Sequence, residues 1–442
     1  MKNNKLSKKN ITDIIGGRRQ FLKTSLLTSG SLLFCRFDSS ANNEILSSIK
    51  NESTQSLQDV IKTIRRTKLE KSVLLASRWL TDIAQIQTEQ PNPDECDVDY
   101  SYQNWKGAIK SEFSSESKWK FFGPVWHTGQ AVKALSLAYK YFREPYLLES
   151  ARMAADFIMN QQQTDKNNVD YGMILAYEDK DGLDKNNKIN TSCVLECCDG
   201  LFTLSEVTGE TQYADCVIAA ISWIIRRMYI NGCFIDLYSP QDKTVQNVWK
   251  NKYGDPGRPL LDDGVLLKAW KYSGQVIFRK VFYEVADCLL KREEPLGNWI
   301  GYAPCKWEDQ VMHPRQAFWW GRPLWLAYKD SGKTKYLDAF NRSCQWYTKA
   351  MRHDGGMIRR TYTDFSTDSF GHATSATSCA VMMFRDAYTE LGDPQYIPYI
   401  TKGLSYALSM QVTEAHDPRM KGVIIEKCLT PGGKDGVPWA VR

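Results

Sequence analysis

The chain contains little histidine and none of the residue patterns that usually mark a bound metal ion. Only five of its 442 residues are histidine, and no Cys-x-x-Cys pair or His-Glu-x-x-His motif occurs. Seven of its 12 cysteines lie inside helix-like patterns, where a thiol serves as a small apolar side chain. These absences argue against a zinc-finger class of protein. We expect no metal and no cofactor.

Long apolar runs and a strong net charge are also lacking in most of the chain. No run of about 18 apolar residues occurs after residue 41, so we expect no membrane span. The formal charge of +6 comes from 57 basic and 51 acidic residues, but residues 1–41 hold eight basic and two acidic ones, which leaves 49 of each. Because the remainder is neutral overall, nucleic acid is not an expected partner.

The first residues carry a pattern typical of an export signal. Arg18 and Arg19 are adjacent, Lys23 follows shortly after, and residues 25–34 are mostly apolar. This arrangement resembles the twin-arginine signal peptide, which a receptor reads on proteins that are exported after folding. We therefore expect an exported, periplasmic protein.

The same region predicts where the mature protein begins. Small residues at positions 39–41 suit cleavage by a signal peptidase, so residues 1–41 form the predicted signal and residues 42–56 a linker. Lipid attachment at Cys35 is not expected, because the bulky Phe34 precedes the cysteine.

A repeat of about 60 residues decides the predicted architecture. A glycine followed four residues later by an aromatic residue occurs at Gly209–Tyr213, Gly274–Phe278, Gly332–Tyr336 and Gly392–Tyr396. A degenerate fifth copy has Phe142 in the place of the glycine, before Tyr146. Helix-length segments flank each copy, and glycine is favoured just past a helix end. Each copy therefore predicts a helical hairpin with a tight turn.

Five such hairpins, together with a helical stretch at residues 61–87, predict an all-α protein. Open helical solenoids usually repeat every 34 to 47 residues, which is shorter than the spacing here. A closed (α/α)6 toroid of about six helical hairpins fits better, as a single catalytic domain over residues 57–442. An irregular all-helical domain is the alternative.

Four segments resemble those of six-hairpin carbohydrate-active enzymes, in particular unsaturated glucuronyl hydrolases. They are Trp126–Gly129, Asp199–Phe202 with the turn that follows it, Trp320–Trp325 and Ser369–Ala376. The resemblance implies the toroid fold and an oligosaccharide substrate. It also implies action on uronic acids in the degradation of anionic polysaccharides. An ulvan-type oligosaccharide lyase or dehydratase would be a divergent relative of these hydrolases.

Polar, charged and aromatic residues recur near the start of the first helix of each hairpin. Equivalent positions in a ring lie at one common end, so these side chains are expected to form one ligand pocket. Three of the five histidines belong to this set. The expected substrate-binding residues are Trp126, Gln130, Asp263, Trp319, Trp320, Arg322 and His372.

Two chemistries suit these residues. In β-elimination on a uronic acid, Arg315 would hold the carboxylate and thereby stabilise the charge that develops when the neighbouring C–H proton leaves. His127, His313 or Tyr171 would take that proton, and Asp199 would protonate the leaving oxygen. We favour this interpretation because histidine and arginine at the pocket exceed what a glycosidase requires.

The alternative is an unsaturated glucuronyl hydrolase in which Asp199 donates the proton. Most glycosidases use two carboxylates, and Asp262 or Asp263 could supply the second. A sugar-binding toroid without catalysis is a further alternative. The ionisable residues expected at the pocket are more numerous than binding alone needs.

Overall fold

The computed structural model describes most of the chain after the predicted signal and linker. The described residues are 59, 62, 64–98, 102–113, 119–121, 123–177, 188–367, 373–428 and 439–441. The predicted export signal, Cys35, the linker and His372 lie outside them.

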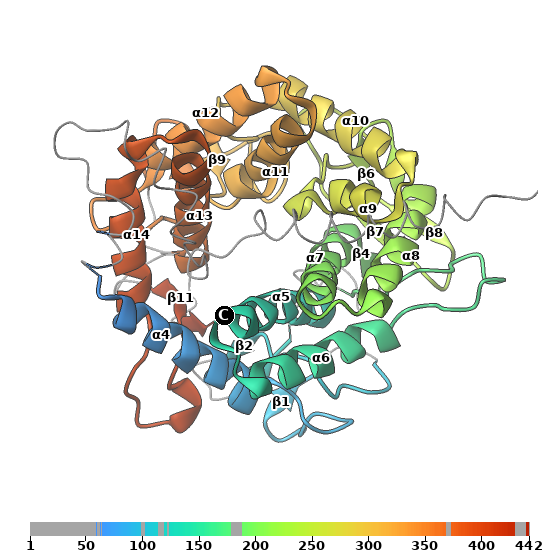
Figure 1. The fold of residues 1–442 in the computed structure, drawn as a ribbon. Helices are drawn as coiled ribbons and strands as arrows, with labels where there is room; N and C mark the ends of the chain where they lie inside the picture. The colour runs from blue at the N-terminus through green and yellow to red at the C-terminus, as the bar shows by residue number, and fades with distance from the viewer. Residues whose placement is uncertain are drawn as a thin grey trace, which may run out of the picture.

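Two concentric layers of helices form a ring, which Figure 1 shows viewed down its axis. The outer helices are α4 (Arg66–Arg78), α6 (Pro145–Asn160), α8 (Thr211–Arg227), α10 (Val276–Arg292), α12 (Thr334–Ala350) and α14 (Ile397–Ser409). The inner helices are α5 (Pro124–Phe142), α7 (Thr191–Thr208), α9 (Val265–Ser273), α11 (Gln316–Ser331) and α13 (Thr374–Leu391). The described chain thus contains five inner–outer hairpins and α4, which confirms the predicted all-α (α/α)6 toroid.

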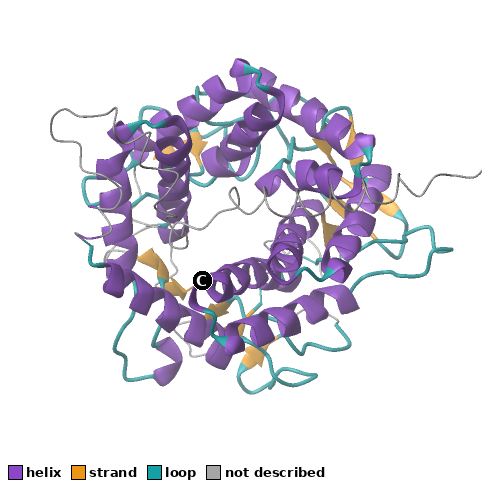
Figure 2. Cartoon of the chain, viewed as in Figure 1, coloured by secondary structure: helices purple, strands orange, loops and turns teal. Residues whose placement is uncertain are grey.

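Short elements extend or connect these helices. A π-helical segment continues α4 (Trp79–Ala84), and 3₁₀ turns lie at Asp262–Gly264, Pro394–Tyr396 and Pro418–Met420. The strands are β1 (Cys96–Asp97), β2 (Glu112–Phe113), β3 (Trp119–Lys120), β4 (Ile189–Asn190), β5 (Tyr229–Ile230), β6 (Cys233–Phe234), β7 (Leu237–Ser239), β8 (Thr244–Gln246), β9 (Val311–Met312), β10 (Thr361–Tyr362), β11 (Ile425–Cys428) and β12 (Trp439–Val441). Figure 2 shows how short the strands are beside the helices. None of the described helices has the length and apolar character needed to cross a membrane.

The repeated glycines end the inner helices as predicted. Gly209, Gly274, Gly332 and Gly392 all adopt positive φ angles, between 68° and 80°, at the C-terminal ends of α7, α9, α11 and α13. In the degenerate copy the prediction is wrong by one position. Phe142 is the last helical residue of α5, and Arg143 takes the left-handed conformation with φ of 61°.

Two glycines bring the inner helices α5 and α7 into close contact. A Cβ atom on Gly200 would lie 2.1 Å from the carbonyl oxygen of Gly129, and one on Gly129 would lie 2.4 Å from the Cα atom of Cys197. Neither helix could approach the other so closely with a larger side chain at these positions. This contact sets Trp126 on α5 beside Glu196 on α7.

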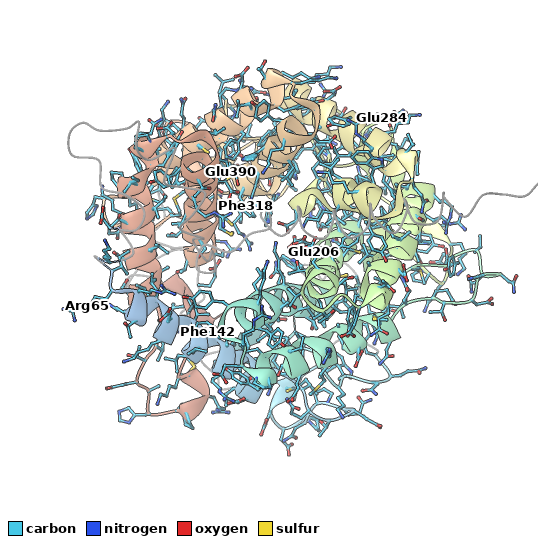
Figure 3. All side chains as sticks on the ribbon, viewed as in Figure 1. Arg65, Phe142, Glu206, Glu284, Phe318 and Glu390 are labelled. Carbon is cyan, nitrogen blue, oxygen red and sulfur yellow. The ribbon has the colours of Figure 1, made fainter. Side chains whose placement is uncertain are left out.

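The ring closes where the chain beyond α14 meets α4. The side-chain amide of Gln411 donates a hydrogen bond to the carbonyl oxygen of Ser72 at 2.9 Å, and the indole of Trp79 donates one to the carbonyl oxygen of Arg419 at 2.7 Å. Figure 3 shows the resulting layers by their side chains. Phe318 on α11 and Glu206 on α7 lie toward the centre of the ring, and Glu284 on α10 lies at its periphery.

Candidate active site

A cavity of about 40 Å³ lies where the N-terminal ends of inner helices meet. We call it the central cavity. Its lining residues are Trp126, Ser192, Glu196, Arg258, Leu260, Asp262, Ala303, Pro304, Gln316, Trp319 and Trp320. This volume admits a few water molecules or one polar group of a sugar, but not a whole sugar ring. A larger substrate would therefore insert one functional group and leave its ring at the opening.

Glu196 is a buried carboxyl group whose pKa lies near neutral pH. Its Oε2 accepts hydrogen bonds from the indole of Trp126 and from the amide of Gln130, the latter at 2.7 Å. Burial and the nearby Asp263 carboxylate raise the pKa of Glu196 to about 7, although these hydrogen bonds oppose the rise. Because Oε2 is occupied by two donors, the proton belongs on Oε1. Glu196 is thus a candidate general acid.

Asp262 is a second carboxyl group in the same cavity. It lies in the 3₁₀ turn before α9, it is buried, and its Oδ2 has no hydrogen-bond partner. Burial, together with the carboxylates of Glu196 and Asp263, raises the pKa of Asp262 well above its usual range. The cavity therefore holds two carboxyl groups whose surroundings favour the neutral form.

Asp199 has the opposite surroundings, although it lies only three residues from Glu196 on the same helix. Its carboxylate contacts the ammonium groups of Lys133, at 2.5 Å, and of Lys268. Burial alone would raise the pKa of Asp199, but the two cations outweigh it and hold that pKa below its usual range. A carboxylate held ionised in this way is a poor proton donor, so the geometry does not favour the expected catalytic role of Asp199.

Asp199 belongs to an ion-pair network that links all five described inner helices. Lys133 also contacts Asp263 at 3.2 Å, Asp263 lies 3.8 Å from Arg322, and Arg322 pairs with Asp386 on α13 at 2.8 Å. Asp263 and Arg322, expected to bind substrate, are thus both engaged within the protein. The network joins α5, α7, α9, α11 and α13 at the centre of the ring.

The expected histidines flank the cavity and stack on its aromatic walls. His127 stacks on Trp126 with ring centroids 4.7 Å apart, and His313 stacks on Trp319 at 5.5 Å. The Arg315 guanidinium lies over the same Trp319 ring, 4.8 Å from its centroid. Neither histidine nor Arg315 lines the central cavity.

The hydrogen bond at His313 defines its tautomer. Its Nδ1 accepts the backbone N–H of Arg315 at 3.3 Å, so a neutral imidazole carries its proton on Nε2. His313 would have to give up this hydrogen bond before its Nδ1 could accept a proton as the base of an elimination.

Tyr171 lies apart from the other candidates. Its loop packs against the outer helix α8, where a Cβ atom on Gly172 would lie 2.2 Å from the carbonyl oxygen of Ala219 and Arg226 donates to the Tyr171 carbonyl oxygen at 2.9 Å. No hydrogen bond joins Tyr171 to the central cavity within the described part of the chain. Its loop packs on the outer layer, and Tyr171 is not among the residues that line the central cavity.

The expected aromatic and amide residues differ in their exposure. Trp126, Trp319 and Trp320 all line the cavity, but Trp320 is only 1% exposed and packs edge-on against Trp299 and Tyr302. The side chains of Trp126 and Trp319 are therefore the aromatic faces closest to the stacked histidines. Gln130 is exposed and orients Glu196.

Among the described residues, one group of side chains has ligand atoms close enough to hold a metal ion, and it lies outside the cavity. The atoms of Cys233, Asp255 and Cys288 all lie within 4.8 Å of one another. The Asp255 carboxylate already accepts hydrogen bonds from Arg292, at 2.7 and 3.0 Å, and from Tyr302. Because the carboxylate is satisfied by these donors, the group is better explained as structural.

Comparison with known proteins identifies the fold. No protein-family model and no curated protein sequence matches the chain. An unsaturated glucuronyl hydrolase specific for heparin matches with a TM-score of 0.59 and 13% identity, over 85% of this chain and 93% of that one. A cellobiose 2-epimerase from Bacillus thermoamylovorans B4167 gives a TM-score of 0.58 and 11% identity, over 86% and 96%. A D-mannose isomerase gives 0.56 and 11%, over 83% and 90%.

These structures are α/α toroids of carbohydrate-active enzymes, so the chain shares their fold over most of its length. From sequence alone, Glu196 is only one more polar residue near the start of a helix, and Asp262 is an alternative to Asp263 as the second carboxylate of a glycosidase. Glu196 and Asp199 are distinguished by the residues that contact their carboxyl groups. Trp126 and Gln130, one helix earlier, hold Glu196, whereas lysines hold Asp199.

Proposed function

We propose that this protein is a carbohydrate-active enzyme that acts on uronic-acid-containing oligosaccharides, with Glu196 as the proton donor. The observation that carries the proposal is the raised pKa of Glu196, about 7, in a cavity at the centre of the ring. A general acid works best when its pKa lies near the working pH. The toroid neighbours named above include an enzyme that acts on glucuronyl groups, which supports the substrate class.

The reaction that best suits this site is hydrolysis of an unsaturated uronide. Such a substrate is an enol ether, which is protonated on carbon and then adds water at the carbon that bears the ring oxygen. The added water loses a proton to the Glu196 carboxylate left by the first step, and the resulting hemiketal opens to a ketone. The hemiacetal then left at the anomeric carbon breaks down to an aldehyde and releases the rest of the oligosaccharide as an alcohol. One proton donor and one water molecule suffice for this sequence, and Glu196 Oε1 supplies the donor. We prefer hydrolysis to elimination because Asp199 is held ionised by its lysines and Nδ1 of His313 already accepts the backbone N–H of Arg315.

Elimination remains a second candidate because of one observation. His127 stacks on Trp126, which itself holds Glu196, so a base and an acid lie on neighbouring turns of α5 and α7. In this reaction His127 would take the proton next to the uronate carboxylate, and Glu196 would protonate the leaving oxygen. The product would be an unsaturated uronic acid, as an ulvan-type lyase or dehydratase would form.

One assay separates these functions. The conjugated double bond of an unsaturated uronic acid absorbs ultraviolet light, so its absorbance falls during hydrolysis and rises during elimination. The protein is incubated with an unsaturated uronate disaccharide and, separately, with a saturated uronate oligosaccharide. A fall with the first substrate supports hydrolysis, and a rise with the second supports elimination. Binding without either change would indicate a non-catalytic toroid.

Glu206→Gln provides the matched control for Glu196→Gln. Both residues lie on α7, but Glu206 is near its opposite end, about 15 Å away along the helix axis. Only the Glu196 variant should lose activity. Equal loss in both variants would contradict the proposed role of Glu196.

A further inference from the structure

Arg258 presents part of its guanidinium group without a protein partner. The residue lines the central cavity and is 7% exposed. Its Nε donates to Asp236 at 2.7 Å, and the guanidinium lies over Trp249, 4.3 Å from the ring centroid. Its buried Nη2, in contrast, finds no hydrogen-bond partner among the described residues. One side of the fork is therefore fixed by the protein, and the other is left for a ligand.

Gln316 is a second buried polar residue without a partner. It is the first residue of α11, it is 0% exposed, and its amide nitrogen and oxygen make no hydrogen bond within the described part of the chain. Asp262 adds a third group of this kind, because its Oδ2 is also buried and has no partner in the same part of the chain. Native proteins rarely leave buried polar atoms unsatisfied, and these three residues all line one cavity. A ligand that supplied the missing hydrogen bonds would remove the penalty.

We propose that Arg258, Gln316 and Asp262 form a subsite that binds the carboxylate of the uronic acid inside the central cavity. This proposal rests on the proposed function and names the part of the substrate that the cavity recognises. A carboxylate accepts hydrogen bonds from the guanidinium, from the amide N–H and from a protonated carboxyl group. The cavity volume of about 40 Å³ suits such a group better than a ring, which would stay between Trp126 and Trp319.

The electrostatics of the cavity are compatible with an anion. Arg258 is balanced by Asp236, and burial favours the neutral forms of Glu196 and Asp262. A bound carboxylate then meets no fixed negative charge on the lining residues. Its own charge would raise the pKa of Glu196 further, since a like charge disfavours ionisation. Substrate binding would thus keep the donor protonated.

The test is a pair of ligands that differ only in the charged group. Methyl β-D-glucuronide and methyl β-D-glucoside are titrated into the full protein by calorimetry. We expect the glucuronide to bind more tightly. Gln316→Leu should weaken glucuronide binding about tenfold or more and leave glucoside binding unchanged, since it removes a hydrogen bond to a charged group. The fold of the Gln316→Leu variant should be intact, because the Gln316 amide makes no hydrogen bond to the described residues of the protein.

Arg258→Lys provides an independent variant. Lysine can keep the charge beside Asp236 but lacks the second arm of the fork, so glucuronide binding should again fall about tenfold. Arg279→Lys, which alters the ion pair between α10 and Asp330 at the C-terminal end of α11, is the matched control and should bind as the unmodified protein does.

Three results would overturn the subsite. They are no preference for the glucuronide in the unmodified protein, an equal effect of Gln316→Leu on both ligands, and equally tight binding of a sulfated glucoside with the same sensitivity to Gln316→Leu. Selective loss of glucuronide binding without turnover of any uronate substrate would instead support the subsite and contradict the proposed function.

Discussion

Replacement of Glu196 by glutamine should change activity and stability in opposite directions. Glutamine keeps the shape of the protonated carboxyl group and cannot donate a proton to the substrate. Loss of a general acid typically lowers the rate by about 10²–10⁴. In the unmodified enzyme, with a pKa of about 7 for Glu196, the protonated fraction is about one half at pH 7 and about one tenth at pH 8. The rate should therefore fall about fivefold between pH 7 and pH 8 and about tenfold for each further pH unit.

The same pKa determines how stability depends on pH. Glu196 in the folded protein holds its proton more tightly than the unfolded chain, whose carboxyl has an ordinary pKa of 4.5. Unfolding then requires release of a proton between about pH 4.5 and 7, so the free energy of unfolding falls as pH rises through this range. The difference of about 2.5 pKa units corresponds to about 3 kcal/mol lost above pH 7. Glu196→Gln removes this loss.

Urea denaturation at pH 5 and pH 9 measures the effect directly. At pH 5 the two proteins should have similar free energies of unfolding, and at pH 9 the variant should be more stable by about 3 kcal/mol. The reasoning would be refuted if the variant were inactive but its difference in free energy of unfolding from the unmodified protein were the same at both pH values. That result would show that Glu196 is ionised like an ordinary glutamate.

Other substitutions test the ring and the predicted export. Asp199→Asn removes the buried carboxylate shared by the half-buried Lys133 and Lys268, although Lys133 keeps its pair with Asp263. It should lower the free energy of unfolding by about 3 kcal/mol in urea denaturation, whereas the exposed Asp215→Asn should change it by less than about 0.5 kcal/mol. Gly200→Ala should separate α5 from α7, costing about 1–3 kcal/mol of unfolding free energy and lowering activity. Gly209→Ala, where no atom lies within 4 Å, should cost stability through its positive φ but leave activity unchanged. Replacing Arg18 and Arg19 with lysine should leave the precursor in the cytoplasm, as cell fractionation would show; unchanged export would contradict the twin-arginine interpretation.

The fold could be predicted from sequence because the residues that end its inner helices act through their own backbone conformation. A glycine at the end of each inner helix relieves a backbone strain that depends only on the residue itself, so the same signal recurs at Gly209, Gly274 and Gly332. The copy without glycine shows the limit of this signal. Arg143 adopts the left-handed conformation despite its side chain, and the position of the turn then cannot be read from residue type.

The candidate site was less predictable because its chemistry depends on contacts between helices. The sequence indicates that carboxyl groups gather at helix ends, but it does not say which of them meets a cation. Asp199 accepts a charged hydrogen bond from Lys268, which lies 69 residues later in the chain. Glu196 accepts a hydrogen bond from Trp126, which lies 70 residues earlier. Exchange of these partners would exchange the protonation states, with no change in either acidic residue.

Glu196 and Asp199 show how one helix can hold two carboxyl groups in opposite states. They are three residues apart on α7, so they lie on the same face of the helix. Two ammonium groups keep Asp199 ionised, and that pair of charges is fixed within a network that spans the ring. Glu196 receives neutral donors only, and burial then keeps its proton in place. Environments that push two pKa values apart usually separate catalytic roles. Here they separate a structural ion from a proton donor, because only Glu196 reaches the cavity.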